Sequence, residues 1–162
     1  MKYRFLDMDG TVCESRQKIS LEVKEKLMGL DCDILVISGA KKERIESQLD
    51  GLPCVILAQS GNDTDLWKNI LIEKEIKEIQ KHIKSIEEWY EPFNNRAELV
   101  QNRGCQISLS FVGHNAPLEH KIKFDPSKEF RQLILLENPF NSETLECCIA
   151  GTTCFDYTRK NG

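Results

Sequence analysis

The sequence predicts an α/β protein in two parts, and three features support that prediction. Short apolar segments alternate with helical patterns from Tyr3 to Ala58, which is typical of a parallel sheet with right-handed connections. A long helical pattern follows, and then several candidates for antiparallel strands. The composition, with 40% hydrophobic and 30% charged residues, is that of a globular chain.

The first part has the pattern strand, helix, strand, helix, strand. Tyr3–Asp7 is a short apolar run that ends in an acid, so we expect a buried strand whose carboxyl end carries function. Ser20 can cap a helix that runs to about Leu30. The other elements are the strands Ile34–Ile37 and Cys54–Ala58, with a helix over Lys41–Leu49 that turns Ile45 and Leu49 inward and closes at Gly51.

The second part begins with isoleucines at alternating steps of four and three residues, from Ile72 to Ile86, which predict an amphipathic helix. A turn-like segment, Glu91–Asn95, comes next. Asp125 as cap and Pro126 at the first position predict a further helix, which buries Phe130, Leu133 and Ile134. The strand candidates are Ala97–Val100, Gln106–Phe111, Leu145–Ala150 and Thr153–Thr158.

This change of pattern predicts two domains, with the boundary near Leu66–Leu71. Residues 1–68 form the parallel α/β part, residues 69–158 form an α+β part with an antiparallel sheet, and residues 159–162 begin a connection back to the first part.

The net charge and the cysteine content limit the classes of binding partner and the cellular compartment that we expect. The net charge of −4 argues against nucleic-acid binding, which usually requires a basic excess, and no apolar run is long enough for a membrane span. The seven cysteines are odd in number and form no CxxC pair, so we interpret them as reduced, mostly buried thiols rather than disulfides or a zinc site. No signal peptide precedes Tyr3, and we expect a cytoplasmic protein.

The residues most indicative of chemistry are Asp7-Met8-Asp9-Gly10-Thr11, directly after the first strand. Gly10 allows the backbone to turn sharply and to present amide groups to an anion. Asp7 could attack phosphorus and form an aspartyl-phosphate, and Asp9 could move protons to and from the oxygens that leave and enter. Two carboxylates at a phosphate site require a cation, which predicts Mg²⁺.

This motif resembles the first motif of the haloacid dehalogenase (HAD) superfamily. The resemblance implies that Asp7 is the nucleophile, that Asp9 is the acid/base, and that Mg²⁺ is held by the Asp7 side chain and the Asp9 carbonyl. Ser38-Gly39, after the second strand, is similar to the second motif of the superfamily and would bind the phosphoryl group together with Gly10 and Thr11. The implied fold is half of a Rossmann-like parallel sheet with an inserted α+β cap of type IIB.

Within the superfamily the chain is most similar to eukaryotic-type phosphomannomutases. The resemblance lies in Arg16-Gln17-Lys18-Ile19, in Ile107–Gly113 and in Gly151–Asp156. It implies a substrate site in which Arg16 and Arg103 contact a phosphorylated small molecule, most simply a sugar phosphate, and Asp156 binds a sugar hydroxyl. Where that family has arginine, arginine and serine, this chain has His114, Lys121 and Cys154.

Two functional classes stay open. A lysine after the cap and a later acidic pair, which complete the metal site in the family, have no counterpart before Gly162. We therefore expect either a Mg²⁺-dependent phosphatase or phosphomutase that is incomplete or inactive as this chain, or a non-catalytic binding module with the same fold. The Asp7 strand would then lie at a sheet edge, which a second copy, a complementing C-terminal segment or the folded-back cap could cover.

Overall fold

The structure is a computed structural model that describes residues 2–14, 17–89 and 96–160. The chain divides into two compact units, residues 1–69 and residues 70–162. Each unit has its own hydrophobic core, and the two cores share no residue. We describe the units separately.

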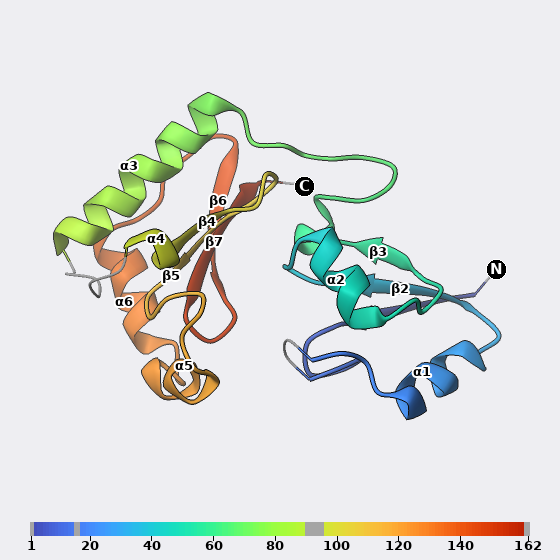
Figure 1. The fold of residues 1–162 in the computed structure, drawn as a ribbon. Helices are drawn as coiled ribbons and strands as arrows, with labels where there is room; N and C mark the ends of the chain where they lie inside the picture. The colour runs from blue at the N-terminus through green and yellow to red at the C-terminus, as the bar shows by residue number, and fades with distance from the viewer. Residues whose placement is uncertain (1, 15–16, 90–95, 161–162) are drawn as a thin grey trace. The chain divides into compact units, whose positions relative to one another are not determined.

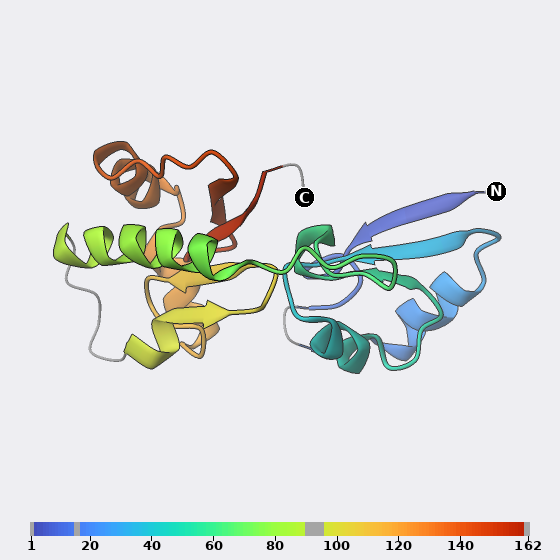
Figure 2. The ribbon, with the colours of Figure 1, turned by 90° about the horizontal axis from the view of Figure 1, so that it is seen from above.

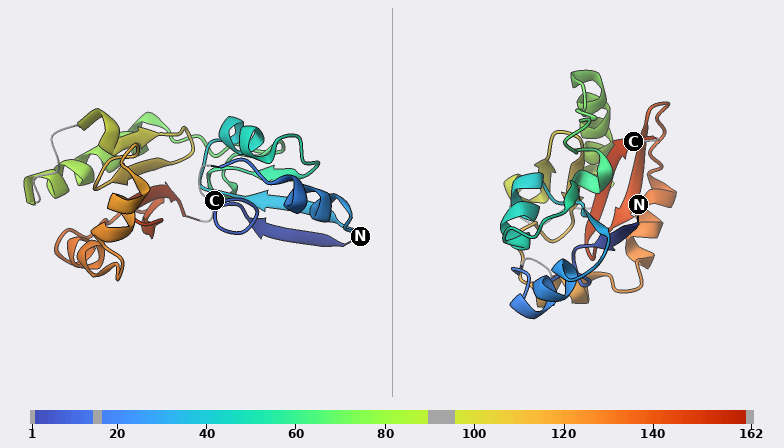
Figure 3. Two further views of the ribbon diagram at one scale, coloured as in Figure 1. Left: turned by 60° about the horizontal axis from the view of Figure 1, so that its bottom comes forward. Right: turned by 90° about the vertical axis from the view of Figure 1, so that its right-hand side faces the viewer.

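Unit 1 is built on a parallel sheet of three strands, β1 (Tyr3–Asp7), β2 (Asp33–Ile37) and β3 (Val55–Leu57), in the order β1-β2-β3. Figure 3 shows the strands side by side. Asp7 lies opposite Ile37, and Ile37 lies opposite Leu57, so the three strands end at the same level. The predicted parallel sheet is confirmed, as is the position of β1 at its edge.

Two helices cover one face of this sheet, α1 (Leu21–Met28) and α2 (Lys42–Leu49), as Figure 2 shows. The amide of Val23 donates to the Ser20 hydroxyl at 3.3 Å, which confirms the predicted cap of α1. The core of this unit contains Ile34, Val36 and Ile56 from the strands and Ile45 and Leu49 from α2.

The prediction that Tyr3–Asp7 is a buried strand is wrong. Tyr3 is 53% exposed and Phe5 is 68% exposed, and only Leu6 of this strand packs against the core. The reason is that β1 is an edge strand, and that α1 and α2 lie on only one face of the sheet. Val55 of β3 is also 47% exposed.

Unit 2 is built on an antiparallel sheet of four strands in the order β4-β5-β7-β6. Its helices and strands are labelled in Figure 1. Alternate side chains of the sheet pack with isoleucines of α3 and α6 into one core that includes Ile79, Ile134, Leu109, Phe155 and Tyr157. The elements are α3 (Glu73–Trp89), α4 (Arg96–Leu99), β4 (Val100–Asn102), β5 (Ile107–Ser110), α5 (Leu118–Phe124), α6 (Glu129–Glu137), β6 (Leu145–Ala150) and β7 (Cys154–Arg159).

The predicted strand over Ala97–Val100 is wrong, because the short helix α4 occupies Arg96–Leu99 and β4 begins only at Val100. The predicted turn over Glu91–Asn95 lies outside the described residues. The structure also has a helix, α5, that the sequence analysis did not predict.

The predicted start of the last helix is partly wrong. Pro126 precedes α6, which begins at Glu129, and Leu133 is 46% exposed rather than buried. Asp125 nevertheless accepts from the amides of Phe130 and Arg131, both at 3.2 Å, and so it does satisfy the free amides of that helix.

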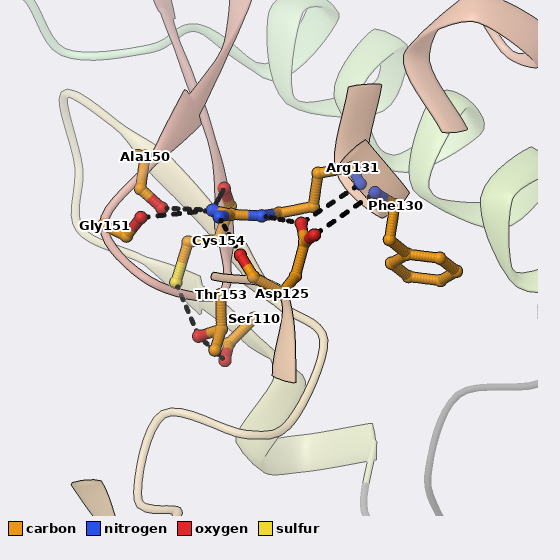
Figure 4. Close-up of polar contacts among 8 residues, drawn as sticks. All are labelled: Ser110, Asp125, Phe130, Arg131, Ala150, Gly151, Thr153 and Cys154. Atoms are coloured by element: carbon orange, nitrogen blue, oxygen red, sulfur yellow. Dashed lines mark hydrogen bonds and ion pairs between the residues drawn. The ribbon is translucent and has the colours of Figure 1, made fainter. Parts of the chain in front are cut away.

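Arg131 takes a buried place in α6 and is 0% exposed. Its Nε donates to an Asp125 carboxylate oxygen at 2.8 Å, and its Nη1 donates to the carbonyl oxygens of Ala150, Gly151 and Cys154 at 3.0, 3.2 and 3.4 Å (Figure 4). The guanidinium therefore holds the turn between β6 and β7 against the start of α6.

The thiols differ from the prediction. All seven cysteines are free, but only Cys13 and Cys105 are buried, and Cys148 is exposed. Among the described helices, none combines the length and the apolar character that crossing a bilayer requires.

Candidate functional site

The carboxyl ends of the three parallel strands bring the predicted phosphoryl-transfer residues of unit 1 to one edge of the sheet. Asp7 is the last residue of β1, and Ser38 follows the last residue of β2. The amide of Met8 donates to the carbonyl of Ile37 at 3.1 Å, which continues the ladder between the two strands up to Ser38. In open parallel sheets, ligands bind at the carboxyl ends of the strands.

The residues after Asp7 wrap around one carbonyl oxygen. The Met8 carbonyl accepts from the amides of Thr11, Val12 and Cys13 at 3.4, 3.1 and 3.1 Å, and Met8 itself is fully buried. The turn requires φ of +83° at Gly10, a value that costs a residue with a Cβ atom about 1 kcal/mol or more. This tight loop leaves Asp7, Asp9 and Thr11 exposed.

The Asp9 carboxylate lies close enough to Cys13 for its charge to act there. Burial first, and then the charge of Asp9, raises the pKa of the Cys13 thiol above its ordinary value. Cys13 is consequently a neutral, buried side chain behind the loop and no nucleophile.

Ser38 is 5% exposed and held from three sides. Its amide donates to the Leu57 carbonyl at 3.2 Å, its carbonyl accepts from the amide of Ser60 at 2.9 Å, and its Oγ accepts from the amide of Ala40 at 3.2 Å. A hydroxyl that accepts one bond can still donate its own proton. The Ser38 hydroxyl therefore keeps a donor proton at the carboxyl end of β2, beside the end of β1.

The turn after β3 is a part of this edge that the sequence analysis did not assign to the site. Gln59, Ser60 and Gly61 have φ of +48°, +59° and +91°, three left-handed residues in succession. Gln59 is buried and its Nε2 donates to Asp63 at 3.1 Å, whereas Ser60 is exposed. Non-glycine residues in this region are strained, and such strain gathers at functional sites.

In unit 2 the structure brings together two of the predicted substrate residues. The Asp156 carboxylate accepts from the Ser108 hydroxyl at 2.5 Å, across the pairing of β5 with β7. Burial raises the pKa of Asp156, although the Ser108 hydroxyl, the positive charge of Arg103 and the amide of Gln106 act in the opposite direction. Arg103 and Asp156 therefore belong to one polar cluster, to which Ser108 and Gln106 also belong.

The other predicted substrate residues of unit 2 have structural contacts. His114 is 4% exposed, and its Nε2 donates to the Ser108 carbonyl at 3.1 Å; it is not the exposed loop residue that its neighbours Gly113 and Asn115 suggest. Lys121 donates to the His114 carbonyl at 2.5 Å. Cys154 is half-buried, with its sulfur 3.7 Å from the Thr153 hydroxyl. Arg16 lies outside the described residues.

The chain is similar in sequence to one known protein and in structure to several others. No protein-family model matches the chain. Phosphomannomutase 1 of Dictyostelium discoideum is 26% identical to it in an alignment 171 positions long, gaps included, which covers 93% of this chain and 68% of that protein. A haloacid dehalogenase-like hydrolase from B. subtilis has a similar structure, with a TM-score of 0.59 and 14% identity over 98% of this chain and 73% of its own. A HAD subclass IIB sugar phosphatase matches with a TM-score of 0.55 and 14% identity, over 99% of this chain and 71% of its own.

The chain has the HAD fold. It is a mixed α/β structure with a parallel three-stranded sheet and a separate antiparallel four-stranded sheet, as the sequence predicts. Asp7, Asp9 and Ser38 lie at the carboxyl ends of β1 and β2 in this fold.

Oxygen ligands suit Mg²⁺, and the loop after β1 exposes Asp7 and Asp9, which offer carboxylate and carbonyl oxygens. Within residues 2–14, 17–89 and 96–160, no three acidic, histidine or cysteine side chains gather closely enough to hold a metal ion by themselves. Mg²⁺ commonly takes only one or two carboxylates from a protein and completes its shell with water and phosphate oxygens, so these two residues fit such a site.

Proposed function

We propose that this protein transfers a phosphoryl group from a sugar phosphate through an aspartyl-phosphate on Asp7. The supporting observation is that Asp7 and Ser38 end adjacent, paired strands, so that a nucleophile and a phosphate-binding hydroxyl share one edge of the sheet. The resemblance to sugar phosphatases and to a phosphomannomutase supports the class of substrate.

In the first half of the reaction an Asp7 carboxylate oxygen attacks phosphorus and forms a new P–O bond. The bond between phosphorus and the sugar oxygen breaks, and the Asp9 carboxyl protonates that oxygen. In the second half an acceptor O–H attacks the acyl phosphate and passes its proton to Asp9. The bond between phosphorus and Asp7 then breaks, which restores both carboxyl groups.

The turn at Gly10 and Thr11 and the start of the segment at Ser38 and Gly39 would hold the phosphoryl oxygens. Because the amides of Gly10, Thr11 and Ser38 donate within the fold, we assign the donor role to the hydroxyl groups of Thr11 and Ser38. Asp7 and Asp9 would hold Mg²⁺, which when bound neutralises charge on the phosphoryl group. Seven free thiols suit a reducing compartment, and we place the protein in the cytoplasm.

Replacing Asp7 by Asn tests the proposal, because an amide is a far poorer nucleophile than a carboxylate. We expect the release of inorganic phosphate from sugar phosphates in the presence of Mg²⁺ to fall to background. The matched control is Asp33→Asn, an exposed carboxylate on β2 that lies opposite Tyr3, at the far end of the same strand pair. Equal activity of Asp7→Asn and Asp33→Asn would contradict the assignment.

The second candidate is a module of the same fold that binds sugar phosphates without turnover. Under that alternative a sugar phosphate binds to the wild-type chain, no phosphate is released, and Asp7→Asn leaves the affinity unchanged or raises it by removing a negative charge.

A further inference from the structure

The turn after β3 holds two adjacent non-glycine residues in the left-handed region of backbone conformation. Gln59 has φ of +48°, and Ser60 has φ of +59° and ψ of +33°. A residue with a Cβ atom is strained there, and it keeps this conformation only where the surrounding structure fixes it. The contacts around the turn show how the strain is maintained and which group it presents.

Backbone hydrogen bonds fix the turn to the segment that contains Ser38. The amide of Gln59 donates to the Ala40 carbonyl at 3.0 Å, and the amide of Ser60 donates to the Ser38 carbonyl at 2.9 Å. The Ser38 amide in turn donates to the Leu57 carbonyl at 3.2 Å. The two strained residues are thus bonded to the same segment as the phosphate-binding serine of the proposed site.

Side chains fix the turn as well. Gln59 is 2% exposed, and its Nε2 donates to Asp63 Oδ2 at 3.1 Å, while Lys68 Nζ lies 3.0 Å from Asp63 Oδ1. Asn62 is 3% exposed, its Nδ2 donates to the Gln59 carbonyl at 3.1 Å, and its Oδ1 accepts from Asn69 Nδ2 at 3.1 Å. The polar side chains of Gln59, Asn62 and Asp63 are therefore all engaged in holding the turn.

Ser60 differs from these residues. It is exposed, and in the part of the chain that the structure describes its hydroxyl has no hydrogen-bond partner. A serine hydroxyl can donate one hydrogen bond and accept two. The strained turn therefore leaves an unpaired hydroxyl on a residue that is bonded to Ser38, at the carboxyl ends of β2 and β3.

The order of the strands determines what this hydroxyl can reach. The strand β2 lies between β1 and β3, and adjacent strands are about 4.8 Å apart. Ser38 is therefore one strand from the end of β1, where Asp7 lies, whereas Ser60 is two strands, roughly 10 Å, from it. A phosphoryl group next to Asp7 is too small to span that distance. In an in-line transfer the leaving group lies on the side of phosphorus opposite the nucleophile, so the sugar extends away from Asp7.

We propose that the Ser60 hydroxyl binds the sugar of the phosphorylated substrate, beside the phosphoryl group that Asp7 and Ser38 take. The inference rests on the proposed function and deepens it, because it adds a specificity-determining residue on a third strand. Unit 1 then recognises the sugar by itself, through the left-handed turn. A phosphate without a sugar does not reach Ser60 and does not depend on it.

Titration of glucose 6-phosphate and of inorganic phosphate, each with Mg²⁺, tests the inference. Both titrations use a chain with Asp7→Asn, so that the sugar phosphate is bound and not turned over. Ser60→Ala should weaken glucose 6-phosphate binding by roughly 5-fold, the usual effect of losing one hydrogen bond between uncharged groups, and should leave inorganic phosphate binding unchanged. Ser38→Ala should weaken the binding of both probes. Ser60→Asn, which tolerates the left-handed backbone and supplies an amide, should keep most of the affinity.

Ser60→Gly separates binding from stability. Glycine removes the strain and loses more chain entropy on folding, so the urea midpoint of unit 1 should rise by a net amount of roughly 0.5 M, followed by the amide signals of β2 and β3. The affinity for glucose 6-phosphate should nevertheless fall as far as in Ser60→Ala. A serine with a purely structural role would gain the same stability and keep its affinity.

Asp50→Gly is the matched control within unit 1. Asp50 is also left-handed, with φ of +50° and ψ of +44°, and it caps the end of α2 that lies away from Ser38. Its ion pair with Lys18 is exposed, and such pairs contribute little to stability. The affinity of Asp50→Gly for both probes should equal that of the chain without this substitution.

Two results would overturn the inference. One is an unchanged affinity for glucose 6-phosphate in Ser60→Ala and Ser60→Gly, and the other is an equal loss for glucose 6-phosphate and inorganic phosphate, which would place Ser60 at the phosphoryl group. Failure of the proposed function looks different. Asp7→Asn would then leave phosphate release unchanged, or neither probe would bind and Ser38→Ala would have no effect, and the inference would fall with the function.

Discussion

Replacing Arg131 by methionine removes a buried cation and keeps most of the volume of its side chain. The guanidinium is 0% exposed, and its partner Asp125 is 5% exposed. Removal of one member of a buried ion pair typically costs about 3–5 kcal/mol, because the other charge stays in the interior without compensation. Here three carbonyl groups of the turn between β6 and β7 lose their donor as well. We expect the free energy of unfolding of unit 2 to fall by about 4 kcal/mol.

Urea unfolding followed by the amide signals of β6 and β7 measures this change. With a slope of about 1.3 kcal/mol per molar, reasonable for a unit of this size, the midpoint should fall by about 3 M. The control is Lys77→Met, which removes an exposed pair with Glu73 one helical turn away and should change stability by less than about 0.5 kcal/mol. A second variant, Asp125→Asn, completes a double-mutant cycle in which the two losses should not add.

The ion pair between Asp125 and Arg131 also predicts that the free energy of unfolding of unit 2 depends on pH. Burial would raise the pKa of Asp125, but the hydrogen bond from Arg131 and the amides of Arg131 and Phe130 outweigh burial, and the pKa is lowered. The stabilisation is therefore complete above the ordinary pKa of about 3.9 and is lost as the pH falls through the lower value of the folded state. A change below 1 kcal/mol in Arg131→Met, or full additivity in the cycle, would refute the reasoning.

Three further predictions concern other parts of the chain. Asp9→Asn should slow phosphate release by roughly 10²–10⁴-fold, measured as kcat on a sugar phosphate, because both proton transfers lose their carboxyl group. Burial lowers the pKa of His82 despite the bond to the Asn138 carbonyl, so unit 2 should lose stability as the pH falls below about 6.5, and urea midpoints of His82→Gln should vary less over that range. Phe5→Lys should reduce self-association in sedimentation experiments, since Phe5 is an exposed apolar residue on an edge strand; an unchanged monomer fraction would argue against pairing at that edge.

Local chemistry made much of the fold predictable. The Ser20 cap, the strand that ends at Asp7 and the strand Leu145–Ala150 are set by residues within one element, and the structure has each of them where the sequence predicts it. The motif around Gly10 could be predicted for the same reason, because a glycine in a tight turn and two flanking acids are visible in the sequence.

The features that the sequence analysis missed or predicted wrongly depend on contacts between residues that are far apart in the chain. Arg131 lies in a helical pattern where arginine is normally solvated, and only the folded turn at Ala150–Cys154 supplies the carbonyl groups that bury it. The apolar run Tyr3–Asp7 looks buried until the sheet order places it at an edge. The bond between the Ser108 hydroxyl and Asp156 could not be predicted either, because it joins residues that only the pairing of β5 with β7 brings together.

The separate hydrophobic cores have a consequence for spectroscopy. Because the two cores share no residue, heating can melt the units in two steps, and a single free energy of unfolding for the whole chain is then undefined. The chain has two tryptophans, of which Trp67 lies in residues 1–69 and donates from its Nε1 to the Gly61 carbonyl at 3.0 Å. In a Trp89→Phe chain, indole fluorescence would report the melting of the strained turn that follows β3, while far-ultraviolet circular dichroism follows both units.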